Sequence, residues 1–344
     1  MKLKKRYLIP LVLIGGIALG PRPDFPAFDG QVQALSMSLG QLDAFIAEKE
    51  AAFDLKDDNH ARIIWADSIR RTEYSVVYLH GFSASPMEGD PIHREFAARY
   101  GCNLYLARLT GHGIKGTESF MGLTPAALME SAKEALAIGN LLGEKVILMS
   151  CSTGSTLGNF LAAESPDKIY AQMLYSPNID IADKASNLLT MPWGKQLAKT
   201  IIGDYNQFTV PPGAEQYWTT KYRVEGLLCL KNLLEETMTA ETFKKIEQPL
   251  YVGYYYKDEE HHDDVVSVEA IKEFFEKVST PADLKKIDTY PNVDSHVGIN
   301  RFQSKDLDDV RQKTFRFAEE VLKLQPVLPP APADEALSTA VESD

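Results

Sequence analysis

The sequence predicts an α/β protein in which a mostly parallel, doubly wound sheet is interrupted by an inserted helical cap. From residue 74 onward, strand patterns alternate with helix patterns, which is typical of a parallel sheet with helices on both faces. The stretch 145–164 contains an apolar strand that turns directly into a helix. Between residues 179 and 242 the alternation stops and aromatic residues gather, which indicates an insertion.

Composition excludes several classes of protein. The 344 residues are 44% hydrophobic and 24% charged, as in ordinary soluble globular proteins. A net charge of −12 argues against a nucleic-acid partner, which would need a basic face. Cys102, Cys151 and Cys229 are too few and too scattered for a disulfide framework or a cysteine-based metal site. No motif calls for a cofactor or a metal.

The first twenty residues differ from the rest of the chain. Four basic residues lie between Lys2 and Arg6, and the uncharged, mostly apolar run Tyr7–Gly20 follows them. This is the layout of an export signal, although the run is shorter than the ~20 residues that span a bilayer. Ala18-Leu19-Gly20 is the best cleavage triplet, but Pro21 follows it. We therefore expect an exported protein, periplasmic or extracellular, for which residues 7–20 offer a membrane anchor.

The first part of the chain contains the opening elements of the sheet. A Pro-rich spacer, 21–30, precedes an expected helix, Gln33–Phe53. Strands are predicted at 61–65, 74–79 and 102–109, with a helix at 91–100 between the last two. Thr124 is a natural N-cap with Pro125 at the first helical position, which predicts a helix that runs to Gly143.

The stretch 145–164 carries the candidate nucleophile. Val146–Met149 reads as a strand covered on both faces, and a helix follows at once. A turn this tight needs small residues two positions before and after its apex, and Ser152 has Ser150 and Gly154 there. With Cys151 or Ser150 at the apex, a bulky Met or Leu would stand in a flanking position. Ser152 is therefore predicted to be the exposed residue of a nucleophile elbow.

The second part resumes the alternation after the insertion. A strand is expected at 169–175, and further strands at 249–256 and 284–290 enclose a helix at 267–278. A closing helix is expected within 301–323. The predicted segments are 1–20 signal or anchor, 21–55 spacer and leading helix, 56–178 first part of the core, 179–242 cap, 243–324 second part of the core, and 325–344 disordered tail.

A serine hydroxyl needs a general base and an orienting acid, which should follow later strands of the sheet. His296 is the one histidine between the last expected strand and the closing helix. The acidic loop 257–264 supplies the carboxylate. Asp263 is preferred because the next helix begins shortly after it, and Asp258, nearest the strand end, is the alternative.

His80-Gly81-Phe82 directly follows the strand that ends at Leu79. A glycine at this position lets the backbone approach a ligand closely. In an acyl-transfer enzyme, the N–H of Phe82 and that of Thr153 would be the two oxyanion donors.

These motifs together resemble the α/β-hydrolases of the serine-lipase and monoacylglycerol-lipase type, with a serine aminopeptidase-like fold. The resemblance covers about residues 73–323, in the family's order, and rests on HGFSASP (80–86), GHG (111–113), SCSTG (150–154), DDVV (263–266) and SHV (295–297). It implies Ser152 as nucleophile, His296 as general base and acid, Asp263 as its orienting group, and Phe82 and Thr153 as oxyanion donors. It also implies a cap over the active site. Ser150 departs from the usual first glycine of the elbow.

The expected function is carboxylester hydrolysis through an acyl-enzyme on Ser152. The substrate would be a small-molecule ester, and an anchor beside an apolar cap favours a lipid-like one. Two alternatives stay open: an acyltransferase or thioesterase with the same three residues, and a catalytically silent binding protein on the same fold. Product analysis with a competing alcohol or thiol separates the first alternative from hydrolysis.

Overall fold

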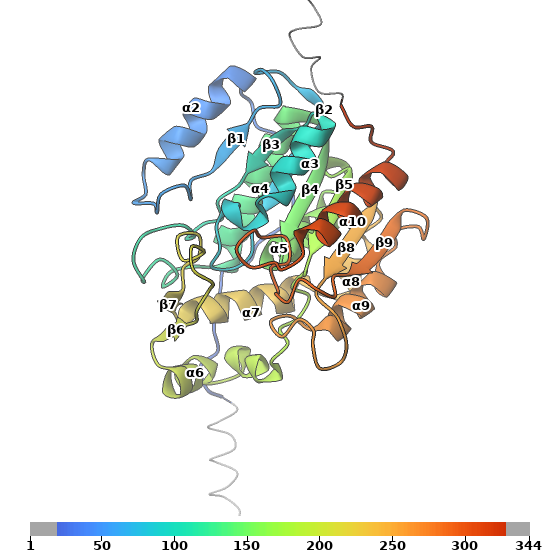
Figure 1. Ribbon diagram of the computed structural model, residues 1–344. Coiled ribbons are helices and arrows are strands. Elements are labelled where there is room, and N and C mark those ends of the chain that lie inside the picture. The colour runs from blue at the N-terminus through green and yellow to red at the C-terminus, as the bar shows by residue number, and fades with distance from the viewer. Residues whose placement is uncertain (1–18, 328–344) are drawn as a thin grey trace, which may run out of the picture.

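A computed structural model describes residues 19–327 of the chain. The predicted basic and apolar start and most of the predicted tail, residues 1–18 and 328–344, lie outside the described residues. Seven strands form one sheet in the order β1-β3-β2-β4-β5-β8-β9, in which only β1 is antiparallel to its neighbour (Figure 1). The strands are β1 (Arg62–Ile64), β2 (Thr72–Leu79), β3 (Asn103–Leu106), β4 (Gly143–Cys151), β5 (Ala171–Tyr175), β8 (Leu250–Tyr254) and β9 (Lys285–Thr289).

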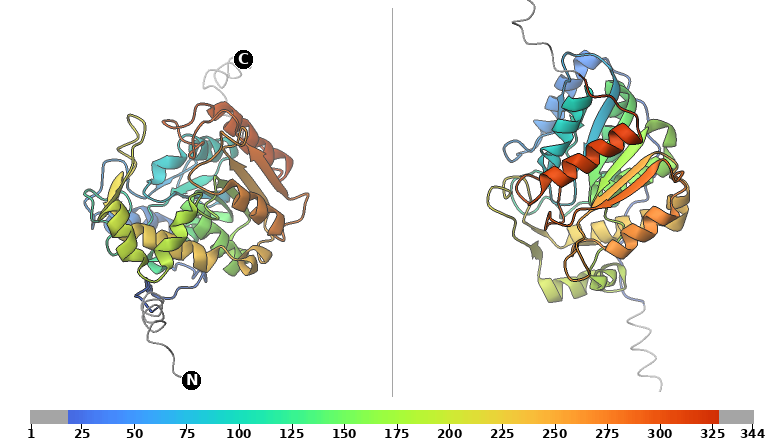
Figure 2. Two further views of the ribbon diagram at one scale, coloured as in Figure 1. Left: turned by 90° about the horizontal axis from the view of Figure 1, so that it is seen from below. Right: turned by 45° about the vertical axis from the view of Figure 1, so that its right-hand side comes forward.

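Helices cover both faces of the sheet, as the doubly wound expectation required. α3 (Ile92–Tyr100) and α10 (Leu307–Glu320) lie side by side on one face (Figures 1 and 2). α4 (Pro125–Leu142), α5 (Thr153–Glu164) and α9 (Val268–Lys277) contribute to the core on the other. Successive strand residues point to opposite faces, so Val76 joins the first core and Val77 the second.

The helix boundaries agree with their capping residues. The Thr124 side chain accepts a hydrogen bond from Ala127 N–H at the start of α4, and Pro125 is the first helical residue. α3 ends at Gly101, whose φ of 64° is the left-handed conformation that glycine adopts readily. The predictions for these two helices are confirmed.

The helix expected over Gln33–Phe53 is shorter than predicted. α2 spans Leu39–Glu50, and Ser38 with Gln41 forms a capping box at its start. Residues 33–37 have no regular structure, and the chain just before them is tied to the end of α5: Val32 N–H donates to Ser165 Oγ at 3.0 Å.

The segment 179–242 departs from the sheet and is not wholly helical. It contains η3 (Lys184–Thr190), α6 (Gly194–Ile202) and α7 (Glu225–Thr237), and α8 (Ala240–Lys244) begins within its last residues. Between α6 and α7, a ribbon pairs β6 (Tyr205–Gln207) with β7 (Lys221–Arg223). Pro211 and Gly213 lie in the loop that joins the two strands. Within residues 19–327, no helix combines the length and apolarity needed to cross a membrane.

Candidate active site

Ser152 lies at the sharp turn between β4 and α5. Its φ of 50° and ψ of −119° are unusual for a residue with a side chain and cost on the order of 1–3 kcal/mol. Two backbone hydrogen bonds hold the turn: Ser152 N–H donates to Tyr175 O at 3.0 Å, and Asn178 N–H donates to Ser152 O at 3.1 Å. The Ser152 residue keeps 7% of its surface exposed, whereas Ser150 is fully buried. The turn thus has the strand–turn–helix geometry that the sequence predicted around Ser152.

Gly154 is required for a reason that differs from the one predicted. A Cβ at this position would lie 2.0 Å from Leu79 O, at the end of β2. The first turn of α5 therefore packs on the neighbouring strand, and that strand, rather than Ser150, excludes a side chain at 154. Ser150 Oγ instead lies 3.0 Å from Ser155 Oγ.

His296 and Asp263 meet in a short hydrogen bond. His296 Nδ1 lies 2.7 Å from Asp263 Oδ2, and the Asp263 side chain is fully buried. The other carboxylate oxygen, Oδ1, accepts from Val265 N–H at 3.0 Å and from Val266 N–H at 3.2 Å. This arrangement fixes the carboxylate and makes Nδ1 the protonated nitrogen of a neutral imidazole.

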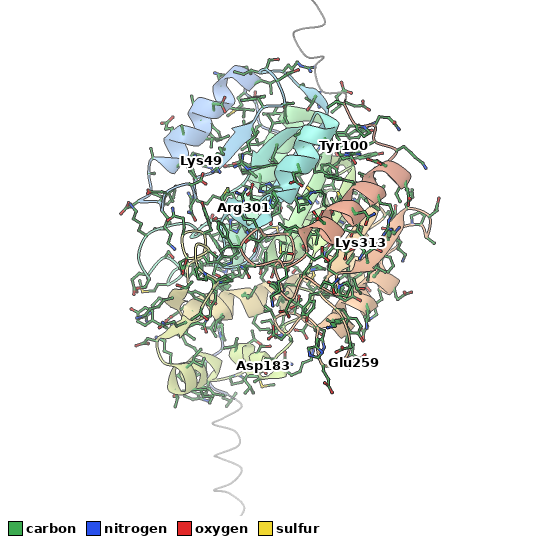
Figure 3. All side chains as sticks on the ribbon, viewed as in Figure 1. Lys49, Tyr100, Asp183, Glu259, Arg301 and Lys313 are labelled. Atoms are coloured by element: carbon green, nitrogen blue, oxygen red, sulfur yellow. The ribbon has the colours of Figure 1, made fainter. Side chains whose placement is uncertain are left out.

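Asp258, the alternative acid, points elsewhere. Its Oδ1 lies 2.7 Å from His261 Nδ1, and its side chain is 51% exposed. Figure 3 shows Glu259, from the tip of the same loop, at the outer edge of the molecule. Of the two candidate acids, the structure brings Asp263 to His296.

The opposite charges of Asp263 and His296 shift the pKa values of both groups. Burial would raise the pKa of Asp263, but His296 and the N–H groups of Val266 and Val265 hold it below its usual value. Burial would lower the pKa of His296, but Asp263, together with Glu88 and Asp264, raises it above its usual value.

Ser152, Asp263 and His296 follow β4, β8 and β9, so all three lie at the C-terminal edge of the parallel sheet, where open α/β sheets bind ligands. No hydrogen bond joins Ser152 Oγ to His296 within residues 19–327, and His296 Nε2 has no hydrogen-bond partner there. Such contacts in unliganded enzymes are often long and tighten when substrate binds.

The two candidate oxyanion donors come from different loops, since Thr153 directly follows Ser152 and Phe82 follows the end of β2. Thr153 is the first residue of α5, where an N–H has no partner within the helix. Neither the Thr153 N–H nor the Phe82 N–H donates a hydrogen bond in the described part of the chain. The loop that carries Phe82 approaches Ser152 closely at Gly81, since a Cβ on Gly81 would lie 3.1 Å from Ser152 Cβ.

The loop after β2 is also tied to the segment 179–242. The Phe82 ring packs against Phe120 and against Tyr222 of β7, with centroids 4.9 and 5.6 Å apart. Thr219 N–H donates to Ser83 O at 2.7 Å. The inserted segment therefore contacts the same loop that carries Phe82.

Two aromatic residues of this segment lie in the interior of the protein. Trp218 and Tyr222 are buried in the packing. Two cavities, of about 390 and 530 Å³, lie elsewhere: one between α2 and α4, the other beside Asp263 and α9, and neither is lined by Ser152 or His296.

Sequence analysis gave no role to two further polar residues near the site, His80 and Glu88. His80 Nε2 accepts from Leu109 N–H at 3.0 Å, so Nδ1 carries the proton and donates to Gly81 O at 2.8 Å. Glu88 is buried, and its Oε2 accepts from Gly81 N–H at 2.7 Å. An acid in a loop after a strand gives no sequence signal that it will be buried. For His80, the position directly before Gly81 was the one feature of the sequence that could have indicated a role at the site.

Comparison with known proteins places the fold. No protein-family model and no curated protein sequence matches the chain. A solved structure described with LipS and LipT, two metagenome-derived lipolytic enzymes, aligns with a TM-score of 0.63 and 14% identity, over 76% of this chain and 98% of that one. A monoacylglycerol lipase from Paleococcus ferrophilus aligns with a TM-score of 0.52 and 14% identity, over 75% and 98%.

Est1E from Butyrivibrio proteoclasticus, with ferulic acid bound, aligns with a TM-score of 0.51 and 17% identity, over 77% of this chain and 95% of that one. These proteins share the α/β-hydrolase fold, and the sheet order and flanking helices described above are those of that fold. The chain therefore has the α/β-hydrolase fold, as the sequence predicted.

Proposed function

We propose that the protein is a serine carboxylester hydrolase. The observation that carries the proposal is the 2.7 Å bond between His296 and the buried Asp263, at the same sheet edge as the strained Ser152 turn. A buried carboxylate that fixes an imidazole with a free Nε2 is the arrangement a serine hydroxyl needs for activation.

The reaction proceeds in two halves. His296 Nε2 takes the proton from Ser152 Oγ while Oγ attacks the ester carbonyl carbon, and the N–H groups of Phe82 and Thr153 bind the resulting oxyanion. The tetrahedral intermediate then collapses, the ester C–O bond breaks, and the imidazolium gives its proton to the leaving alcohol. Water, deprotonated by His296, attacks the acyl-enzyme in the same manner and releases the acid and free Ser152.

Asp263 accepts a hydrogen bond from the protonated Nδ1 and stabilises the imidazolium that forms in each half. Asp263 itself stays ionised throughout the reaction, because its pKa is held below the usual value of a carboxyl group.

We further propose an exported protein that is held at a membrane by residues 7–20 and acts on lipid-like esters. The described chain begins beside α6, where Trp193 N–H donates to Pro21 O at 2.8 Å. Six large apolar side chains on and before α6 are 40–69% exposed: Leu188, Met191, Trp193, Leu197, Ile201 and Ile202. An apolar face next to the attachment of an apolar leader suits a lipid surface. Fractionation of expressing cells tests this, and recovery of the full chain without membranes would contradict it.

Hydrolysis of p-nitrophenyl esters over a range of acyl lengths tests the enzymatic proposal. We expect wild type to hydrolyse them and Ser152→Ala to lose at least about 10³-fold in kcat. Ser150→Ala, two residues away and buried, is the matched control and should keep activity of the wild-type order. The preferred acyl length reports the size of the acyl site. Full activity in Ser152→Ala would rule the proposal out.

A further inference from the structure

Glu88 is a buried acid that the proposed mechanism does not use. It lies in η1 (Pro86–Gly89), in the loop between β2 and α3, and is 2% exposed. Its Oε2 accepts two hydrogen bonds, from Gly81 N–H at 2.7 Å and from Tyr78 Oη at 2.9 Å. No ion pair involves Glu88 in the described part of the chain.

The Glu88 carboxyl group and the Ser152 side chain both lie next to Gly81. A Cβ on Gly81 would lie 2.7 Å from Glu88 Oε1 and 3.1 Å from Ser152 Cβ, so only glycine fits between them. The buried carboxyl group of Glu88 is therefore close to the candidate nucleophile, with only the space beside Gly81 between them.

The peptide groups on both sides of Gly81 are fixed. The Gly81 N–H is held by Glu88, and the Gly81 carbonyl accepts from His80 Nδ1 at 2.8 Å and from Ala84 N–H at 3.3 Å. In a trans peptide the C=O and the following N–H point in opposite directions. Holding Gly81 O on one side thus turns the Phe82 N–H to the other, and the bond to Glu88 fixes the preceding peptide.

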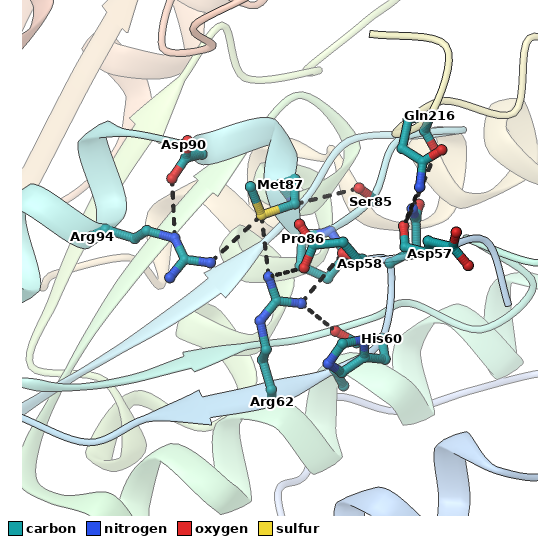
Figure 4. A network of polar contacts seen from close by, with 12 residues as sticks. Asp57, Asp58, His60, Arg62, Ser85, Pro86, Met87, Asp90, Arg94 and Gln216 are labelled. Atoms are coloured by element: carbon teal, nitrogen blue, oxygen red, sulfur yellow. Dashed lines mark hydrogen bonds and ion pairs between the residues drawn. The ribbon is translucent and has the colours of Figure 1, made fainter. Parts of the chain in front are cut away.

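The turn that carries Glu88 is itself well supported. Figure 4 shows the Met87 sulfur between Arg62 of β1 and Arg94 of α3, at 3.2 and 3.6 Å from their guanidinium nitrogens. Asn300 Nδ2 donates to Met87 O at 3.2 Å and to Glu88 O at 3.0 Å. Because Asn300 lies four residues after His296, the turn is also linked to the loop of the candidate base.

We propose that Glu88 is a positioning residue of this site, with two parts. It holds the Phe82 N–H toward the oxyanion, and it places an ionisable carboxyl group beside Ser152, where its charge acts on His296. The inference rests on the proposed function, since it assigns Glu88 a part in the same reaction.

Three titratable side chains act on the charge of Glu88: Tyr78 of β2, which donates a hydrogen bond to it, Cys151 of β4, and His296 in the loop after β9. Burial raises the pKa of Glu88 to about 7, although the Gly81 N–H, Tyr78, His296 and Cys151 all act to lower it. The negative charges of Asp263, Glu88 and Asp264 each raise the pKa of His296. Removal of the Glu88 charge should therefore make the imidazolium easier to deprotonate.

Two variants separate the two parts of the proposal. Glu88→Gln keeps an acceptor for Gly81 N–H but loses the charge, so the acid limb of kcat/KM against pH should move to lower pH. Glu88→Asp keeps the charge but withdraws the carboxyl group by one methylene. It should keep the acid limb near that of wild type and lose at least about tenfold in kcat at similar KM.

Glu95→Gln is the matched control, since it removes one charge from α3, where Glu95 pairs with Arg311 at the surface. It should leave the acid limb in place. Rates are normalised to the fraction of protein that reacts with a fluorophosphonate, so a misfolded fraction does not enter kcat.

Either an unshifted acid limb in Glu88→Gln or a wild-type kcat in Glu88→Asp would overturn the proposal. Failure of the proposed function looks different: Ser152→Ala would then keep its activity whatever stands at position 88.

Discussion

Asp263 illustrates what a single residue contributes at this site. Sequence analysis narrowed the acid to a loop with five carboxylates but ranked Asp263 and Asp258 by position alone. The structure separates them, because Asp263 is fully buried against His296 and two backbone N–H groups, whereas Asp258 caps its own loop at His261. Which of several nearby acids folds inward depends on loop conformation, and residue order does not encode that directly.

The first prediction concerns the ionisation of His296. The base must be neutral, so kcat/KM should fall as pH drops through the raised pKa of His296. Asp263→Asn removes the main cause of that raised pKa and the partner of Nδ1. It should lower kcat by about 10³–10⁴-fold and move the acid limb to lower pH. Asp258→Asn is the matched control and should keep the wild-type profile. Equal losses in the two variants would contradict the assignment.

A second residue-scale prediction concerns stability. The pKa of Glu88 rises from 4.5 to about 7 in the folded protein. A raised folded pKa stabilises below the unfolded pKa, and this stability is lost as pH rises through about 7. The shift corresponds to on the order of 3 kcal/mol. Urea unfolding at pH 5 to 8 should show wild type losing stability relative to Glu88→Gln. Parallel pH dependences would contradict the assignment of a raised pKa to Glu88.

At the scale of elements, the sequence was most informative where local chemistry decides a boundary. Thr124 and Pro125 correctly predicted the start of α4, and Gly101 the end of α3. The start of α2 was misplaced because the capping box that begins the helix is formed by Ser38 and Gln41, and sequence analysis did not identify it. The β6–β7 ribbon was missed since its strands have three residues each, too short for a periodic pattern.

The third prediction tests the packing of α5 on β2. Gly154→Ala places a Cβ 2.0 Å from the backbone oxygen of Leu79. A backbone atom of a central strand cannot move aside as the end of a flexible side chain can. We expect a loss of about 3 kcal/mol or more in unfolding free energy, together with lost activity. Gly40→Ala is the control in α2: no atom lies within 4 Å of its Cβ, so it should stabilise by about 0.5–1 kcal/mol. Chemical denaturation measures both, and a neutral Gly154→Ala would contradict this packing.

At the scale of the whole molecule, strand–helix alternation was enough to predict the mostly parallel sheet. It could not predict how the inserted segment meets the site. Tyr222 and Thr219 contact the loop that carries Phe82, and such contacts arise only when segments far apart in sequence meet in three dimensions.

The fourth prediction concerns the exposed apolar face of α6. Leu197→Glu with Ile201→Glu places two charges on side chains that are 40% and 69% exposed, so folding should be unaffected. If α6 lies on a lipid surface, the double variant should lose activity toward esters in vesicles and keep it toward short soluble esters. Lys244→Glu with Lys277→Glu, at other exposed positions, is the control. Equal activity of both double variants on vesicles would contradict a role for α6.

The central claim is that Ser152 is the nucleophile of a serine hydrolase, and covalent labelling tests it most directly. The protein is treated with a fluorophosphonate, digested, and mapped by mass spectrometry. We expect one adduct, on Ser152, that is absent in Ser152→Ala and forms at least about 100-fold more slowly in His296→Ala. An unlabelled Ser152 in protein that still hydrolyses esters, or labelling that does not depend on His296, would contradict it.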